Sequence, residues 1–406
     1  MGSDVEKAVL VLNAGSSSHK CALFQGNEKL PLWRTHMEWK EGYSSAYLHL
    51  FEKGKQVLSE PVSIASAEEG LAKIFSHLPH VELQAIGHRV VHGGEKFTEI
   101  SLVTEEVEGE IERCSYLAPL HNPANLAGIR MAKLAFPKVS QYAVFDTAFH
   151  ATMPEEIATY PLPYHWREKG LRRYGFHGIS YSYCTTRAQE FCPSPSHKMV
   201  ICHLGAGASL CAVSEGHSIH TTMGMTPLEG LMMGTRSGSI DPGLLLHLLK
   251  VEEISPDALE TMLNKESGLL GISGVTEDMR DLLEMAEKGE QRAILAIEMF
   301  TKRLSLYLGE MIAALGGLDT LIFTAGIGEH VPLIREKALE PFRFMGVEID
   351  QRKNCERGGE ERVISTERSS VTVAVLPTHE EWEIAQQINN HTCRSRPLEA
   401  PQQSNS

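Results

Sequence analysis

Short apolar runs alternate along the chain with amphipathic stretches and small polar turns. Runs rich in strand-favouring residues cover Val9–Leu12, Cys21–Phe24, Ala85–Val91, Tyr142–Phe145, Met199–His203, Leu210–Val213, Leu321–Thr324 and Val371–Leu376. Apolar runs of this length, bounded by turn residues, are typical of buried strands. The pattern therefore predicts a mixed α/β protein.

Helical periodicity and helix start signals predict long helices between these strands. Asn122 and Asp241 are each followed by proline, so each pair supplies an N-cap and a first-turn proline. A third stretch repeats its apolar side chains on one helical face and ends at two glycines. The predicted helices cover residues 122–136, 242–249 and 290–315.

Two strand pairs are joined by turns of very small residues. VLVLNAGSSS contains Gly15, Ser16 and Ser18, and VICHLGAGAS contains Gly205 and Gly207. A further apolar run follows each turn, so both are predicted β-hairpins; a third run, LIFTAGIGEH, also enters a small-residue turn. Glycine lets backbone N–H groups approach an anion, so these turns are either ordinary hairpin tips or phosphate cradles. Their separation by half the chain indicates a duplicated domain.

Composition narrows the class of protein. The 406 residues are 42% hydrophobic, enough to fill the cores of two domains. With 52 acidic against 38 basic residues the net charge is −14, which argues against a nucleic-acid partner. The acidic start MGSDVEK is not typical of a signal peptide, and no apolar run reaches the length of a membrane span. The eight cysteines form no C-x-x-C pair, so we expect small buried thiols in a cytoplasmic protein.

Charged residues occur at strand ends and in glycine-rich turns, where catalytic groups are often found. Arg89 interrupts an apolar run, so its guanidinium is either in a structural ion pair or aimed at an anion. Arg236 lies in a glycine-rich turn, with a solvated loop arginine as the alternative. Asp146 ends a predicted strand, and Glu380 precedes a predicted helix. Each carboxylate fits either an active site or a helix cap.

Two histidines and a charged pair complete the candidates. His121 precedes the predicted helix start at Asn122, and His177 lies between Phe176 and Gly178. Single histidines are more often packed or exposed than catalytic. Asp278 and Arg280 fit a nucleoside contact or, alternatively, a surface helix start. Small-residue cradles, two arginines, a histidine and carboxylates for magnesium are together the set that phosphoryl transfer requires.

Taken together, these segments resemble the acetate and propionate kinase family. The matching motifs are VLVLNAGSSSHK, GHRVVHGG, APLHNP, VFDTAFH, RYGFHG, HLGAGAS, MGMTPLEGLMMGTRSG, DMRDL, FTAGIGE and PTHEE, in family order over about residues 8–390. The resemblance implies a duplicated actin-like ATPase fold, shared by sugar kinases, actin and heat-shock ATPases, with two domains and an interdomain cleft. Domain one would cover 1–148 with a returning helix at about 382–393, domain two 149–381, and a disordered tail 394–406.

The resemblance also implies an activity. It is the reversible, direct in-line transfer of the γ-phosphoryl group of ATP to acetate, giving acetyl phosphate and ADP. Mg²⁺, which Mn²⁺ can replace, would be the cofactor, ATP and ADP the co-substrates, and the assembly a homodimer. A carboxylate is already a nucleophile, so the difficulty is to bring two anions together, which arginines and a cation can screen. The alternatives are a propionate kinase of the same family and a catalytically weakened nucleotide-binding regulator.

Roles are carried over residue by residue. The catalytic group would be Asp146, Arg89, Arg236, His177 and His121, and the magnesium ligands Asn13 and Glu380. The acyl methyl group would lie among Val91, Leu120, Phe176 and Pro227, where valine at position 91 favours acetate over propionate. The nucleotide would be bound by Ser16, Ser18, Lys20, His203, Leu204, Gly205, Ala206, Gly207, Asp278, Met279, Arg280, Gly326, Ile327, Gly328, Glu329 and His330.

Three positions depart from the family pattern. Ala206 replaces the asparagine usual in the second turn, and His330 replaces the asparagine that usually ends the adenosine loop. His19 replaces a usual apolar residue. Without the amide side chain at position 206, one polar contact to the nucleotide phosphates should be missing, while the backbone donors remain.

Overall fold

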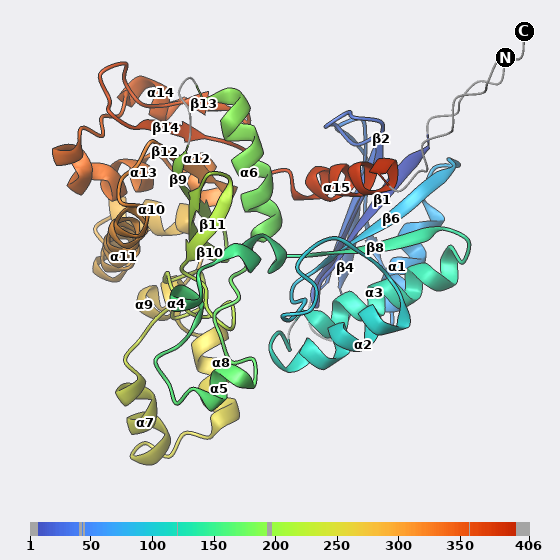
Figure 1. Ribbon diagram of the computed structural model, residues 1–406, viewed down its shortest axis with the longest axis horizontal. Helices are drawn as coiled ribbons and strands as arrows, with labels where there is room; N and C mark the ends of the chain where they lie inside the picture. The colour runs from blue at the N-terminus through green and yellow to red at the C-terminus, as the bar shows by residue number, and fades with distance from the viewer. Residues whose placement is uncertain are drawn as a thin grey trace, which may run out of the picture. The chain divides into compact units, whose positions relative to one another are not determined.

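The chain divides into two compact units. The computed structural model describes residues 7–39, 43, 45–119, 121–192, 197–356 and 358–394. Unit 1 consists of Met1–Ala148 with His379–Ser406, and unit 2 of Phe149–Thr378 (Figure 1). The chain therefore returns to unit 1 just before Glu380, whereas the predicted boundary was residue 381. From residue 395 onward, the predicted tail lies outside the described residues.

Unit 1 is built on an eight-stranded sheet. Its strands are β1 (Ala8–Ala14), β2 (Ser18–Gln25), β3 (Trp33–Trp39), β4 (Ala46–Glu52), β5 (Lys55–Val62), β6 (Leu83–Val90), β7 (Ser101–Leu102) and β8 (Ser140–Phe145). The strand order is β5-β4-β3-β2-β1-β6-β8-β7. Strands β1 to β5 form an antiparallel meander, while β1, β6 and β8 are parallel. The carboxyl ends of β1, β6 and β8 therefore lie at one edge, beside the β1–β2 turn.

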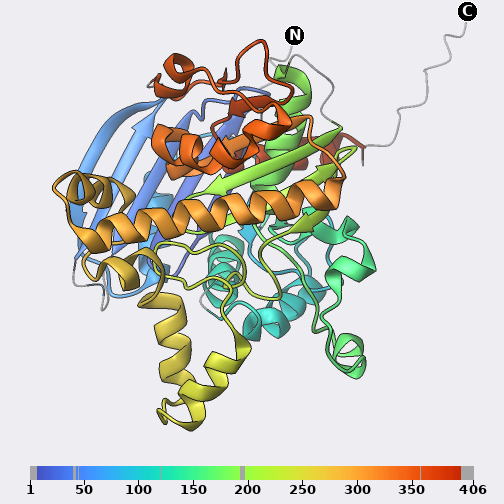
Figure 2. The same cartoon turned by 90° about the vertical axis from the view of Figure 1, so that its left-hand side faces the viewer.

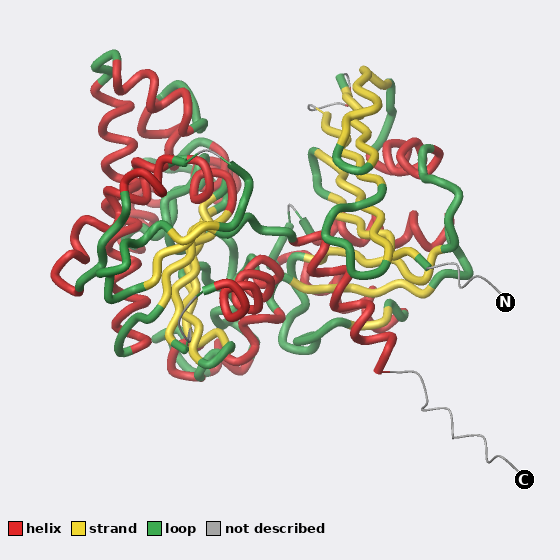
Figure 3. The backbone as a smooth tube through the Cα atoms, turned by 90° about the horizontal axis from the view of Figure 1, so that it is seen from above, coloured by secondary structure: helices red, strands yellow, loops and turns green. Residues whose placement is uncertain are grey.

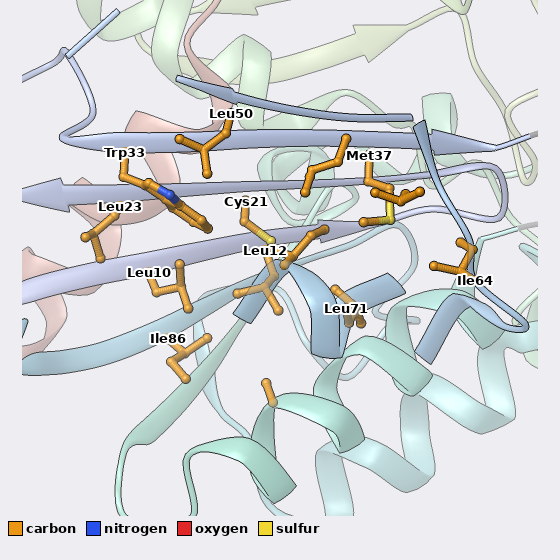
Figure 4. Packing of buried hydrophobic residues seen from close by; sticks show 14 of the residues in the cluster. Leu10, Leu12, Cys21, Leu23, Trp33, Met37, Leu50, Ile64, Leu71 and Ile86 are labelled. Carbon is orange, nitrogen blue, oxygen red and sulfur yellow. The ribbon is translucent and has the colours of Figure 1, made fainter. Parts of the chain in front are cut away.

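Helices cover both faces of this sheet. They are α1 (Ala67–Ser76), α2 (Glu105–Arg113), α3 (Asn122–Ala135) and α15 (Glu380–Arg394), with a short 3-10 turn η2 (Cys114–Tyr116). Leu10 and Leu12 of β1 point into a core that includes Leu71 of α1, as Figure 4 shows. The alternate side chain, Val11, lies on the face that α15 covers. This is the alternation that a strand buried on both faces requires.

Helix α15 lies very close to β6. A Cβ on Gly87 would come within 2.5 Å of Ile388 and 2.7 Å of Ile384, so only glycine fits at that position without displacing the helix. Gly87 is two residues from Arg89, and Glu380 begins the same helix. The close contact therefore fixes the strand that carries one candidate residue against the helix that carries another.

Unit 2 repeats this plan. Its strands are β9 (Lys198–Leu204), β10 (Ala208–Ser214), β11 (His217–Thr221), β12 (Thr320–Thr324), β13 (Arg362–Val363) and β14 (Thr372–Val375), in the order β11-β10-β9-β12-β14-β13. An antiparallel meander again leads into parallel strands, here β9, β12 and β14. The order β11-β10-β9-β12-β14 matches β3-β2-β1-β6-β8 of unit 1. The duplicated core predicted from the two small-residue turns is confirmed.

Helices also flank the sheet of unit 2, as the tube view in Figure 3 shows. They are α4 (Glu155–Ala158), α5 (His165–Glu168), α6 (Gly178–Phe191), α7 (Pro242–Lys250), α8 (Pro256–Lys265), α9 (Gly268–Ser273), α10 (Met279–Glu287), α11 (Gln291–Leu315), α12 (Ala325–His330), α13 (Pro332–Leu339) and α14 (Gln351–Cys355), with 3-10 turns η3 (Ala148–Thr152) and η4 (Glu340–Met345). The long helix α11 runs across the sheet and packs on β9, β10 and β11 (Figure 2).

Two local expectations are refined. The run LIFTAGIGEH, predicted to be a strand entering a small-residue turn, is strand β12 followed directly by the short helix α12. Of the eight cysteines, six are buried as predicted, but Cys355 and Cys393 are exposed. No helix among the described residues combines the length and apolar character needed to cross a membrane.

Candidate active site

Four polar side chains gather at the carboxyl edge of the unit 1 sheet. Arg89 of β6 donates from Nε to Asp146 Oδ1 at 3.1 Å and from Nη2 to Asp146 Oδ2 at 2.6 Å. Its Nη1 donates to Asn13 Oδ1 at 3.4 Å, and its Nε lies 3.8 Å from Glu380 Oε2. Asn13 lies in β1, Asp146 directly follows β8, and Glu380 begins α15. The parallel strands β1, β6 and β8, with the start of α15, therefore bring Asn13, Arg89, Asp146 and Glu380 together.

The two carboxylates in this cluster are not equally neutralised by Arg89. Burial lowers the pKa of Arg89, but the carboxylates of Asp146 and Glu380 outweigh burial and the net shift is upward, so Arg89 stays charged. Burial raises the pKa of Glu380, and the attraction of Arg89 offsets that only in part. Asp146 is 2% exposed and is bound by both arms of the guanidinium fork. Glu380 is therefore the carboxylate that lacks sufficient positive charge around it.

This deficit fits a divalent cation that arrives with a phosphate ligand. Among the residues that the structure describes, no three or more His, Cys, Asp or Glu side chains are grouped to hold a metal ion. Asn13 and Glu380 offer an amide oxygen and a carboxylate, both near Arg89. Mg²⁺ is commonly held by one or two protein oxygens together with substrate phosphates and water. The donor set therefore suits Mg²⁺ bound along with a nucleotide.

Glu380→Gln is expected to stabilise the ligand-free protein at neutral pH. Because the folded-state pKa of Glu380 is raised, the folded protein holds this proton longer than the unfolded chain. The stability that depends on Glu380 is therefore full below the ordinary pKa and is lost as pH rises through the raised folded value. Urea unfolding from pH 4 to pH 8 should show a gain of about 1 kcal/mol for the variant at the upper end, since a buried charge is removed. Equal stability curves for the two proteins would contradict the assignment.

In unit 2, two histidines and an arginine surround the turn between β9 and β10. The turn is closed by a hydrogen bond from Gly205 N to Gly207 O at 3.0 Å. A Cβ on Gly207 would lie 3.4 Å from His177 Nε2 and 3.5 Å from Arg236 Nη1. The rings of His177 and His203 stack with their centroids 4.1 Å apart. Side chains with nitrogen donors therefore line this glycine turn.

Arg236 has no carboxylate partner among the described residues. Its Nη1 donates to the carbonyl of Pro227 at 3.1 Å and contacts Met233 Sδ at 3.8 Å. Burial lowers its pKa from the ordinary arginine value, although the group remains charged at neutral pH. A half-buried guanidinium without a fixed counter-charge is suited to bind an anion. This feature favours the anion-binding alternative for Arg236 over the solvated loop.

A cavity of about 490 Å³ opens beside the same turn. It is lined by eight of the predicted nucleotide residues: Gly205, Ala206, Asp278, Met279, Arg280, Gly326, Ile327 and His330. Gly234, Glu277 and Val331 also line it. A cavity of this size, with mainly apolar walls and a few polar groups, suits a nucleoside.

Several of the predicted nucleotide-binding residues make contacts within the protein. Asp278 caps α10 through Arg280 N at 2.8 Å and pairs with the Arg280 guanidinium at 2.5 Å. Leu204 and Gly328 are buried under the turn, and Glu329 accepts from Thr378 N at 3.3 Å. These contacts hold the wall of the cavity. The side chains of Leu204 and Glu329 do not line it.

The remaining predicted residues are divided between the units. In unit 1, Ser16 and Lys20 are exposed and Ser18 is half-buried at the β1–β2 turn, Val91 is buried after β6, and His121 precedes α3. In unit 2, Phe176 is buried and its carbonyl accepts from His150 Nε2 at 2.9 Å, while Pro227 is half-buried. Leu120 lies outside the described residues. Of the proposed acyl-pocket residues that the structure describes, Val91 belongs to unit 1, and Phe176 and Pro227 belong to unit 2.

Sequence reasoning missed the residues that orient the histidines. Ser209 Oγ lies 2.8 Å from His177 Nδ1 and is also hydrogen bonded to Tyr181. Ser180 Oγ lies 2.9 Å from His203 Nδ1. Ser209 could have been identified from the sequence because it is a polar residue within the apolar run of β10. A buried hydroxyl group needs a hydrogen-bond partner.

Comparisons with known proteins agree on one family. The model of the acetokinase family matches residues 8–386. An acetate kinase of Microcystis aeruginosa is 48% identical over 396 residues, covering 93% of this chain and 98% of that protein. A crystal structure of Porphyromonas gingivalis acetate kinase aligns with a TM-score of 0.88 at 40% identity, covering 95% of this chain and 99% of that one. A propionate kinase from Francisella tularensis aligns with a TM-score of 0.87 at 38% identity, covering 94% and 98%.

Proposed function

Because the chain belongs to the acetokinase family, we propose that it transfers the γ-phosphoryl group of ATP to acetate, giving acetyl phosphate and ADP. The protein is a kinase whose phosphoryl acceptor is a carboxyl group. The observation that supports the proposed chemistry most is Arg236, a half-buried guanidinium that lacks a carboxylate partner and lies beside a glycine turn. The transfer is direct, in-line and reversible.

The residues contribute mainly by positioning and by neutralising charge. Acetate is already a nucleophile at neutral pH, so no strong general base is required. Its approach to the γ-phosphoryl group is opposed by the charge on both, and Arg89 and Arg236 reduce that repulsion. Asp146 holds the Arg89 guanidinium in one orientation through its two hydrogen bonds. His177 presents Nε2 beside Gly207, where it donates to oxygen atoms of the transferring group.

Asn13 and Glu380 are the proposed magnesium residues. Magnesium, when bound, neutralises negative charge on the phosphate oxygens. Glu380 supplies the carboxylate whose raised pKa marks it as short of positive charge, and Asn13 supplies an amide oxygen. Mn²⁺ prefers similar oxygen ligands and should also support activity.

The nucleotide is proposed to bind with its base and ribose in the cavity of unit 2. The backbone N–H groups of the Gly205–Gly207 turn, with His203, face the phosphates. Ser16, Ser18 and Lys20 are proposed to meet the transferring phosphoryl group, which would explain why small hydroxyl residues separate β1 from β2. The exposed position of Lys20 and Ser16 leaves both accessible to a ligand.

A coupled assay with acetate, propionate and butyrate, with and without magnesium, tests the reaction. Trapping the product with hydroxylamine should give acetohydroxamate from acetate and ATP, and the signal should require a divalent cation. No acyl hydroxamate from any of the three acids would overturn the proposal. Tight ATP binding without turnover would favour the regulator, for which Ala206 and His330 are the supporting observations.

Propionate is the alternative acceptor, and the similarity to the Francisella propionate kinase supports this alternative. Val91→Ala should raise the ratio of kcat/KM for propionate to that for acetate by about 10–100-fold, because one methylene is worth about 1–3 kcal/mol in an apolar pocket. Steady-state kinetics with both acids measures the ratio. Leu102→Ala, an exposed apolar position of unit 1, is the matched control and should leave the ratio unchanged. An unchanged ratio in Val91→Ala would remove Val91 from the acyl pocket.

We also propose a cytoplasmic homodimer. The proposal of a dimer is supported by helix α7, where Leu244 and Leu246 are 46% and 53% exposed and no residue is buried. Such an apolar helix face is expected to be covered by another surface. The thiols of the described residues are all free, as expected in a reducing compartment. Light scattering of the purified protein would give the mass of the assembly.

A further inference from the structure

A chain of hydrogen bonds leads from a buried tyrosine to the ring of His177. Tyr181 lies one turn after His177 on α6, and Tyr181 N donates to the His177 carbonyl at 3.0 Å. The Tyr181 hydroxyl is hydrogen bonded to Ser209 Oγ of β10. Ser209 Oγ in turn lies 2.8 Å from His177 Nδ1. All three groups belong to unit 2.

The direction of the first hydrogen bond follows from burial. Tyr181 is 0% exposed, and burial raises the pKa of its phenol well above the ordinary value, so the phenol keeps its proton. That proton needs an acceptor, because an unpaired buried donor is costly. Ser209 Oγ is the one hydrogen-bond partner of this hydroxyl among the described residues. Tyr181 therefore donates to Ser209.

The direction of the second hydrogen bond follows from the first. The proton of the serine hydroxyl needs an acceptor of its own, and His177 Nδ1 is at 2.8 Å. If Ser209 donates to Nδ1, Nδ1 carries no proton and the neutral imidazole carries its proton on Nε2. His177 Nε2 is the atom beside the Gly207 turn, 3.4 Å from the position of a Cβ on that glycine.

His203 repeats the arrangement with a different pair of hydroxyl groups. Thr378 Oγ1 donates to Ser180 Oγ at 3.0 Å, and Ser180 Oγ lies 2.9 Å from His203 Nδ1. His203 Nε2 is 3.8 Å from the position of a Cβ on Gly205. In both cases one hydroxyl donates to a second, the second donates to Nδ1, and Nε2 lies beside a glycine of the same turn.

We propose that Tyr181 and Thr378 are positioning residues that hold His177 and His203 as the tautomers with the proton on Nε2. The turn between β9 and β10 is then flanked by two fixed N–H donors as well as by its own backbone N–H groups. Both donors are directed at the place where the proposed function puts the nucleotide phosphates, so the catalytic meaning of the tautomers rests on that function. The tautomers themselves do not depend on it.

Nitrogen NMR of ¹⁵N-histidine-labelled protein tests the proposal without relying on activity. The two resonance sets are assigned by their loss in His177→Gln and His203→Gln. In the wild type, Nδ1 of both rings should have the shift of a nitrogen without a proton. Tyr181→Phe should move only His177 towards the tautomer with the proton on Nδ1, and Thr378→Val only His203. Tyr183→Phe, which removes a hydroxyl on the same helix that bonds Glu361, should move neither ring.

Kinetics provides the second measurement. Tyr181→Phe should lower kcat about tenfold, the effect of losing one oriented hydrogen bond, with KM for ATP and acetate within about twofold. Ser209→Thr retains a hydroxyl and should recover most of the activity that Ser209→Ala loses. Wild-type rings with the proton on Nδ1, or unchanged spectra in both folded variants, would overturn the proposal. Selective spectral shifts in a protein that forms no acetyl phosphate would support the tautomers and refute the proposed function.

Discussion

Arg236→Ala should lower kcat about 10²–10³-fold, because a charge that stabilises the transition state in a partly dry site is worth about 2.7–4 kcal/mol. The folded protein should lose little stability. Arg236 makes one hydrogen bond to a carbonyl and one weak contact to sulfur, and its burial without a carboxylate is itself unfavourable. The variant should therefore have a Tm equal to that of the wild type or slightly higher.

Two controls separate charge from packing in this experiment. Arg303 also belongs to unit 2 and also donates to a backbone carbonyl, that of Ser239 at 3.0 Å. Arg303→Ala should leave kcat unchanged. Added guanidinium should restore part of the activity of Arg236→Ala, since the missing group is the charged fork. Near-normal turnover in Arg236→Ala would refute the role assigned to this arginine.

Arg89→Ala should lower both kcat and stability, in contrast to Arg236→Ala. The loss of rate should again be about 10²–10³-fold. The loss of stability should be about 3–5 kcal/mol, because Asp146 is 2% exposed and would lose both hydrogen bonds from the guanidinium that neutralises this buried carboxylate. Steady-state kinetics and urea unfolding measure the two effects on the same preparation.

The double variant Arg89→Ala/Asp146→Asn distinguishes the two losses. Replacing the Asp146 carboxylate with an uncharged amide should recover much of the stability. It should recover none of the activity, since no guanidinium is present at position 89 to contact substrate. Arg89→Lys should keep part of the stability but lack the two-armed contact to Asp146. If Arg89→Ala unfolds at the same urea concentration as the wild type, the ion pair between Arg89 and Asp146 does not stabilise the folded protein.

The sequence predicted the fold where each strand is apolar throughout. Val9–Leu12 and Met199–His203 lie in central parallel strands that are buried on both faces, and such strands are visible as continuous apolar runs. Strands β3, β4 and β5 were missed because they are exposed on one face. Along β3, buried Trp33 and Met37 alternate with exposed Arg34 and Glu38, so the strand contains no continuous run of apolar residues. The three strands form one edge of the eight-stranded sheet of unit 1.

More of the candidate site could be predicted from the sequence in unit 1 than in unit 2. Arg89 was chosen because it interrupts an apolar run, and Asp146 and Glu380 for their positions at a strand end and a helix start. The parallel strands bring their carboxyl ends together at one edge of the sheet. Tyr181 and Ser209 could not be chosen in this way, because their importance depends on which hydroxyl faces which ring nitrogen. Glu277 and Gly234 line the cavity of unit 2 because of the way two loops fold, and loop conformation leaves no periodic pattern in the sequence.

The path of the chain has a consequence for the order in which the protein is made. Unit 1 is discontinuous: its sheet is encoded before residue 149, but helix α15, which covers one face of that sheet, follows all of unit 2. Because synthesis proceeds from the N-terminus, unit 2 can complete its core before α15 has been made. Until then, the face of β1 and β6 that carries Val11 and Gly87 lacks the helix that packs on it. Glu380, the first residue of α15, is synthesised only after all of unit 2. A nascent chain that ends before residue 380 would therefore contain every residue that lines the cavity of unit 2 but would lack the proposed magnesium ligand Glu380.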